Sequence, residues 1–284
     1  MGSATHVDIQ HDAHCPEIAP LLCAEDEIEP HVHQQGITLT RTELNVSVGL
    51  GNDLQAQLSL PIDIKQMSIR YVDTNGDSLE PPYGDIHHRD EVLAGLGDGR
   101  LSIGTYKMLN SSWIVGLNVG TLLPLGRTEE NPYALAAEEL WHQHVQMGGG
   151  TFIPSATGTA IFMGNRWGGY GFATGQFSLY ANNKGYTAPS SGNLGLGPSF
   201  RPSASTQLLL MVEGSLEGPE EWADYDSDND GRRSAIAGLS GLWSITKTTV
   251  LQAQARTTIW QVDLGKEQVK QVLVGTLGVS HTFR

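Results

Sequence analysis

Apolar and polar residues alternate one by one through many segments of the chain. After the turn at 51–53, the stretch LQAQLSLPIDI places its large apolar side chains on one face and Gln, Ser and Asp on the other. The apolar face consists of Leu54, Ala56, Leu58, Leu60, Ile62 and Ile64. Successive side chains of a β-strand point to opposite faces, so this period of two predicts strands.

The same alternation recurs at 41–50, at 113–125 and in TVLQAQARTTIW at 249–260. The polar face of these segments is rich in Gln, Asn, Ser, Thr and Gly, while most charged residues lie in the connections. A soluble sandwich would instead bury a bulky face and expose a charged one. The pattern therefore favours a membrane barrel with an apolar outer face and a polar lumen.

Short and long connections alternate along the chain. Short turns lie near 51–53, 110–112, 166–169, 201–204 and 246–248, and long polar connections span 10–36, 66–98, 126–150, 183–192, 217–233 and 263–271. This order predicts an all-β, transmembrane, antiparallel up-and-down barrel with short periplasmic turns and long extracellular loops. Closure would pair every backbone group, as lipid demands.

We count eleven clear strands between 37 and 284, and segment 3–10 supplies a twelfth because bacterial barrels have an even number. Ten strands is the alternative count. The chain is expected to form a single domain, 1–284, with an N-terminal strand and loop at 1–36 and the barrel body at 37–284. Aromatic residues beside the short turns predict a girdle at the inner membrane interface: Trp113, Trp167, Tyr170, Trp243 and Phe283.

Composition agrees with a location in the outer membrane of a Gram-negative cell. Charged residues make up only 17% of the 284 residues, and the net charge of −14 argues against nucleic-acid binding. The chain contains no run of 18 apolar residues, so we predict no membrane-spanning helix. The polar start carries no signal peptide, as in a mature sequence. The expected partners are membrane lipid and lipopolysaccharide, a small-molecule or metal-ion solute, and a protein contacting the loops.

Two sets of residues resemble known outer-membrane proteins. The last strand, with Phe283 near its end, resembles the terminal assembly signal of Gram-negative outer-membrane barrels, although His281 and Arg284 depart from that pattern. The stretches TELNVSVGLGNDLQAQLSLPI, GLGDGRLSIGTYKML and GGGTFIPSATGTAIF are similar to the transporter barrels grouped with the phenol-degradation meta-pathway proteins. The resemblance covers most of 37–284 and implies a porin-like barrel for small, often hydrophobic, molecules.

Charged residues on the predicted lumen face are few. They are Arg41, Glu43, Asp63, Arg201, Glu213 and Arg256. Such charges select solutes in open channels, and in a narrow barrel they also pair across the interior and seal it. The sequence leaves both alternatives open.

Histidines gather in three of the long loops. His31 and His33, and His142 and His144, form His-x-His pairs, while His87 and His88 are adjacent. Alternate residues of an extended segment point the same way, so each His-x-His pair can offer two imidazoles to one metal ion. Imidazole suits Cu or Zn, so we predict a transition-metal site on the extracellular side.

Two further features of the loops carry chemistry. Asp226, Asp228 and Asp230, followed by Gly231, match the first half of a calcium-binding loop, and Ca²⁺ is the candidate ligand. Cys15 and Cys23 are expected to form a local disulfide in an exported protein.

The leading function is an outer-membrane porin-like channel or transporter for a small solute. One alternative is a metal-binding barrel without an open pore, in metal handling or an electron-transfer assembly. Another is a hydrolase at the rim, yet the chain has no G-x-S-x-G or H-E-x-x-H motif, so we expect no enzyme.

Overall fold

The computed structural model describes residues 1–13, 31–80, 89–225, 227, 229–265 and 268–283. Within this part of the chain, one large antiparallel sheet contains the following strands in chain order: β1 (Gly2–Ala13), β2 (His31–Gly51), β3 (Leu54–Asp73), β4 (Glu91–Leu96), β5 (Gly99–Met108), β6 (Trp113–Leu123), β7 (Ile153–Met163), β8 (Trp167–Gln176), β10 (Ser191–Phe200), β11 (Thr206–Glu217), β13 (Arg232–Ser244), β14 (Thr249–Asp263) and β15 (Gln268–His281). A separate two-stranded sheet joins β9 (Tyr186–Thr187) to β12 (Glu221–Trp222), and α2 (Pro132–Ala137) is a short helix.

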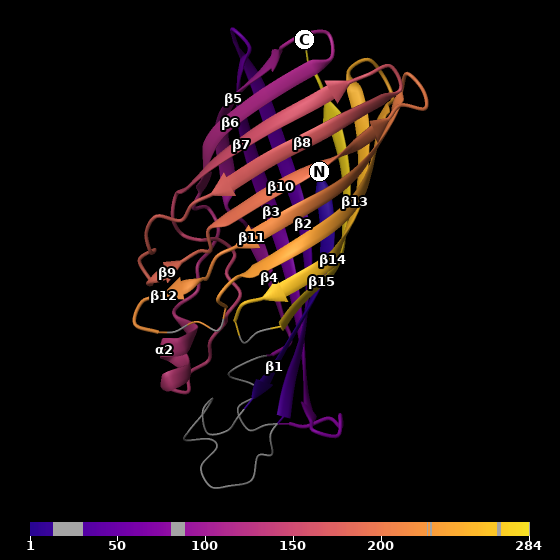
Figure 1. Cartoon of the computed structure of the whole chain (residues 1–284). Helices are drawn as coiled ribbons and strands as arrows, with labels where there is room; N and C mark the ends of the chain where they lie inside the picture. Colours follow the sequence, from indigo (N-terminus) through magenta and orange to yellow (C-terminus); the bar gives the residue numbers. More distant parts are fainter. Residues whose placement is uncertain (14–30, 81–88, 226, 228, 266–267, 284) are drawn as a thin grey trace.

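The large sheet closes on itself as a barrel (Figure 1). β4 and β5 both pair with β3, so together they occupy one position in a wall of twelve strands. The first and last strands close the barrel, because β1 pairs with β2 on one side and with β15 on the other. The count of twelve strands, including the first strand, is therefore confirmed, and the last strand has a partner along both edges.

The outer wall carries an apolar belt between two sets of aromatic residues. Trp167 is 64% exposed at one end of β8, and Phe177 is 55% exposed just beyond the other end. Ten residues rising about 3.3 Å each, in a strand tilted by about 40°, cover about 25 Å of membrane. Exposed leucines, valines and isoleucines fill this interval on neighbouring strands, including Leu194, Leu196, Leu210, Val212, Leu239, Ile259 and Leu277.

Four of the five girdle residues predicted from the sequence are exposed on the outer wall: Trp113, Trp167, Trp243 and Phe283. Tyr170 is not, because it lies three residues after Trp167 and therefore faces the lumen. The register partner of Tyr170 on β10 is Gly197. Gly197 is on the lumen face of that strand, because its neighbour Leu196 is exposed on the outer face. The prediction that Tyr170 belongs to the girdle was wrong.

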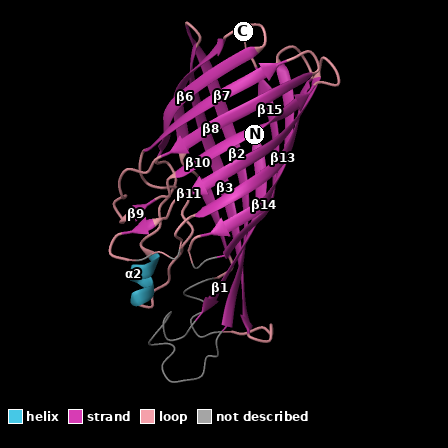
Figure 2. Ribbon diagram, in the orientation of Figure 1, coloured by secondary structure: helices cyan, strands magenta, loops and turns pink. Residues whose placement is uncertain are grey.

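The two ends of the barrel differ (Figure 1). Short turns and the C-terminus lie at one end, and the long connections, with α2, β9 and β12, lie at the other (Figure 2). β2 and β3 are 21 and 20 residues long and, together with β1, project on the side of the long loops. Their hairpin turns tightly at Asn52 and Asp53, which both adopt positive φ. No helix in the described part of the chain is long and apolar enough to cross a membrane.

Candidate functional site

The lumen is lined by the face of each strand that points away from lipid. On β2 and β3, Leu44 and Ile62 are more than half exposed on the outer wall, whereas Asp63 is fully buried on the inner one. Thr157 of β7 and Thr174 of β8 join their hydroxyl groups at 3.0 Å on this inner face. The lumen wall is therefore polar and locally hydrogen-bonded, as the alternation predicts.

One ion pair is locked into the wall. Arg41 Nε and Nη2 donate to the two carboxylate oxygens of Asp63 at 2.7 and 2.8 Å, and the residues are register partners on β2 and β3. A Cβ at Gly97 would lie 2.5 Å from Asp63 Oδ2, so only glycine leaves room for this pair. The two charges neutralise each other between neighbouring strands and do not reach across the lumen.

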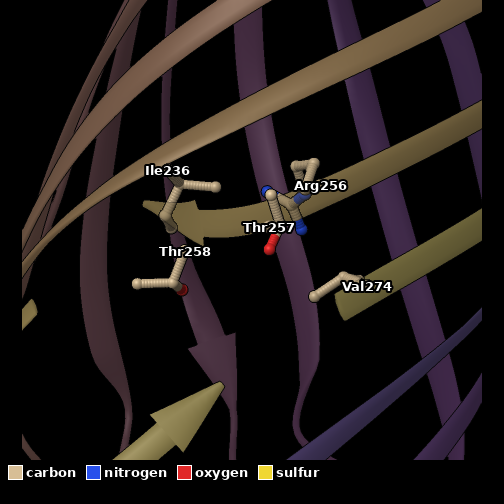
Figure 3. A pocket seen from close by; sticks show the side chains of 5 residues that line it. All are labelled: Ile236, Arg256, Thr257, Thr258 and Val274. Carbon is tan, nitrogen blue, oxygen red and sulfur yellow. The ribbon is translucent and has the colours of Figure 1, made fainter. Parts of the chain in front are cut away.

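A second and longer ion pair joins β11 to β14, on the other side of the junction between β1 and β15. Arg256 Nη1 is 3.6 Å from Glu213 Oε2. A cavity of about 40 Å³ opens beside Arg256, lined also by Ile236, Thr257, Thr258 and Val274 (Figure 3). Among the described residues, Glu213 Oε2 and Arg256 Nε have no hydrogen-bond partner. Because the cavity beside Arg256 has room for a water molecule or two, Arg256 Nε can bind water or a polar group of a solute there.

Two large aromatic side chains on the lumen face lie flat against the wall, because the register partner of each on the neighbouring strand is a glycine. Phe172 pairs with Gly195, and a Cβ at Gly195 would lie 2.3 Å from the Phe172 ring. The same relation holds for Tyr106 and Gly116, at 2.4 Å. Gly195 also pairs with Glu213, so one row across β8, β10 and β11 carries a ring, a glycine and a carboxylate.

The connection 124–152 folds back against the inner wall at the extracellular mouth. Met147 is buried against Met67 of β3 and Leu93 of β4, with Ile37 and Val145 packed beside them. Lys65, one inward position below Met67, donates a hydrogen bond to the carbonyl of Gln146. The second half of this connection therefore occupies part of the lumen entrance.

Asp98 fixes both ends of the same connection. Its two carboxylate oxygens accept hydrogen bonds from the backbone N–H groups of Gly126, at 3.0 Å, and Gly149, at 2.7 Å. A Cβ at Gly148 would lie 2.2 Å from Asp98 Oδ1, so the backbone approaches this carboxylate closely. We call segment 124–152, held in this way, the constriction segment.

Other long connections pack beside the constriction segment. The rings of Tyr186 and Trp222 pack at 4.8 Å where β9 meets β12, and both side chains are buried. Tyr133 of α2 donates to the Ser227 hydroxyl at 3.4 Å, and Lys184 Nζ donates to the carbonyl of Thr128 at 2.8 Å. These contacts join the described parts of three extracellular connections, 124–152, 177–190 and 218–231, to one another.

The periplasmic end of the lumen is hollow and basic. A hollow of about 610 Å³ lies between the turns 165–166 and 201–205, with Leu242, Ser244 and Val250 on its wall. Arg166 and Arg201 both line it, and the backbone N–H of Arg201 donates to the carbonyl of Arg166 at 2.8 Å. Arg201, predicted to face the lumen, therefore lies at the exit of the lumen. Glu43, another of the predicted lumen charges, lies on β2 and accepts a hydrogen bond from the side chain of Asn45 at 2.8 Å.

The histidines of each His-x-His pair are adjacent in space. His31 and His33 are almost fully buried, with their Nε2 atoms 3.4 Å apart. The rings of His142 and His144 are 5.2 Å apart. His142 Nδ1 donates to the Leu140 carbonyl at 2.8 Å, and burial lowers the pKa of His142. No group of three or more His, Cys, Asp or Glu in the described residues is placed to hold a metal ion.

Several predicted site residues lie outside the described residues: Cys15, Cys23, His87, His88, Asp226 and Asp228. Of the calcium candidates, only Asp230 is described, and it is exposed. Gly231 after it has a φ of +95°, and a Cβ there would lie 2.2 Å from the carbonyl oxygen of Glu217. Gly231 thus adopts a conformation and a close approach that favour glycine, while the calcium site and the disulfide stay predictions.

The hypothesis of a hydrolase draws attention to His6. Its Nδ1 lies 2.9 Å from Thr38 Oγ1 and its Nε2 lies 3.0 Å from Asp8 Oδ1. These three side chains lie on the outer wall of the barrel. The backbone of β1 is hydrogen-bonded there in ladders to both of its neighbours, β2 and β15. Backbone N–H groups held in such ladders do not form an oxyanion hole, so we assign no activity to these residues.

Comparison with known proteins adds information on the fold. No family model matches the chain, and no curated protein matches it. Among solved structures, it is similar to an outer-membrane channel from Pseudomonas putida F1, with 13% identity, a TM-score of 0.55, and coverage of 98% of this chain and 95% of that one. The fold is that of an outer-membrane β-barrel.

Two other solved structures are similar at lower scores. One is the NanC porin, with 9% identity, a TM-score of 0.46, and coverage of 98% of this chain and 100% of that one. The other is the toluene transporter TodX of Pseudomonas putida, with 7% identity, a TM-score of 0.43, and coverage of 99% and 90%.

Proposed function

We propose that this barrel is a channel for a small solute across the outer membrane. The proposal rests on one observation: the charged and aromatic side chains of the inner wall lie along that wall and do not cross the lumen. The ion pair of Arg41 with Asp63 joins neighbouring strands, and Arg256 meets Glu213 along the same wall, so neither pair closes the lumen. Phe172 and Tyr106 lie flat over glycines, which keeps their rings out of the bore.

The constriction segment determines the size of solute that enters. Met147 of this segment packs against the wall formed by β3 and β4, and Asp98 holds both ends of the segment. Below this point the inner wall offers hydroxyl and amide groups, and at the exit it offers Arg166 and Arg201. A small molecule that passes the mouth thus meets a polar path with a basic exit.

Swelling of proteoliposomes tests this proposal. Vesicles containing the folded barrel are diluted into isotonic solutions of uncharged solutes of increasing size, and the fall in turbidity reports their entry. We expect the smallest solutes to enter and larger ones to be rejected. Vesicles with heat-unfolded protein provide the control. If correctly folded barrels admit no solute beyond this control, the proposed channel is wrong.

A further inference from the structure

His31 and His33 present two imidazole nitrogens to one point. Both residues lie on β2, two positions apart, so their side chains share a face. Their Nε2 atoms are 3.4 Å apart, and their ring centroids are 5.3 Å apart with a tilt of 42°. The two rings are therefore neither stacked nor turned away from each other.

The separation of 3.4 Å is informative. Two nitrogen ligands that each lie about 2.0–2.1 Å from a tetrahedral zinc ion are about 3.3–3.4 Å apart. The same separation also falls within hydrogen-bond range, with one imidazole as the donor and the other as the acceptor. The geometry of His31 and His33 therefore suits two ligands of one metal ion without any movement of the rings.

The surroundings of the pair hold both imidazoles in place. His33 is fully buried and His31 is 2% exposed, so their orientation is fixed by packing rather than by solvent. Tyr71, the register partner of His33 on β3, meets the His33 ring edge-on at 4.8 Å.

We infer that His31 and His33 chelate a transition-metal ion of tetrahedral preference, with Zn²⁺ the best fit, on the inward face of β2 at the extracellular side. The described residues supply two of its ligands, since no larger group of ligating side chains is found among them. Neutral imidazole nitrogens are common ligands of zinc, and they do not bind calcium or magnesium comparably. This site does not depend on an open lumen, so it stands or falls separately from the channel.

Metal titration of the purified, refolded barrel tests the inference. Protein prepared without metal-affinity steps is treated with chelator, dialysed, and titrated with Zn²⁺ by calorimetry. Co²⁺ is used in parallel, because tetrahedral cobalt gives an intense visible absorption that octahedral cobalt lacks. We expect saturable binding of one ion. His31→Asn and His33→Asn should each weaken that binding by at least about tenfold and abolish the cobalt absorption.

Two matched variants serve as controls. His6→Asn and His281→Asn change histidines that are exposed on the outer wall, at the two ends of the membrane span. Both should leave the affinity for Zn²⁺ within about twofold of the original, because neither imidazole is near the pair. Folding of every variant is checked by its heat-dependent shift in electrophoresis. Folded protein that binds no Zn²⁺, or binds it equally well as His33→Asn, overturns the inference.

Discussion

Replacing Asp98 by alanine should release the constriction segment. The carboxylate accepts one backbone hydrogen bond from Gly126 and one from Gly149, and these bonds hold the two ends of the segment. Hydrogen bonds to a charged group contribute about 1.5–3 kcal/mol each, and the lower value applies because Asp98 is only partly buried. The two bonds together give about 3 kcal/mol, which changes the ratio of released to closed segment on the order of 100-fold.

Single-channel recording in planar lipid bilayers measures this ratio. The Asp98→Ala barrel should spend a much larger fraction of time in a high-conductance state than the original barrel. Asp98→Asn keeps one acceptor oxygen, so its shift should be intermediate, on the order of tenfold. Asp77→Ala removes an exposed carboxylate from the connection that follows β3 and should change nothing. Equal open-state occupancy in all four proteins would refute the role given to Asp98.

Two further substitutions test the lumen wall. Gly195→Ala places a methyl group against the ring of Phe172, so we expect the ring to move into the lumen and the single-channel conductance to fall. Gly158→Ala is the matched control, because a Cβ at Gly158 meets nothing within 4 Å. Equal conductance of the two variants would argue against this role of Gly195. Arg41→Ala leaves Asp63 buried without its partner and should lower the free energy of unfolding by about 3–5 kcal/mol, measured by urea denaturation in vesicles. Adding Asp63→Asn should recover part of this loss, and no recovery would mean that burial of the charge is not its cause.

The barrel itself could be predicted from the sequence because lipid imposes a strict alternation. Each residue of a spanning strand faces either lipid or lumen, so Arg41, Asp63, Glu213 and Arg256 could be assigned to the inner face by parity. Tyr170 shows what happens when parity is ignored. Its closeness to a turn suggested the girdle, although its odd spacing from Trp167 places it in the lumen.

The constriction segment could not be predicted in the same way. Its position depends on contacts between Met147 and two distant strands, and on backbone N–H groups that bind Asp98. Such tertiary contacts follow no period along the chain. One signal was present nevertheless: Met67 and Leu93 are large and apolar at positions whose parity points inward, so something apolar had to cover them.

The histidine pair lies between these two cases. The His-x-His spacing on an extended segment predicts that the imidazoles of His31 and His33 point the same way, and the structure places them so. Their burial and the edge-on contact with Tyr71 depend on how β2 and β3 extend beyond the barrel. Spacing therefore gave the direction of the side chains, whereas register determined their neighbours.

The central claim is that the lumen conducts, and single-channel current through the original barrel tests it most directly. Refolded protein, shown by its heat-dependent electrophoretic shift to be folded, is inserted into a planar bilayer in salt solution, with the Asp98→Ala barrel recorded under the same voltage. We predict discrete current steps of uniform size, which become longer or larger in the variant. Folded barrels that insert but give no steps, with or without Asp98, would contradict the account.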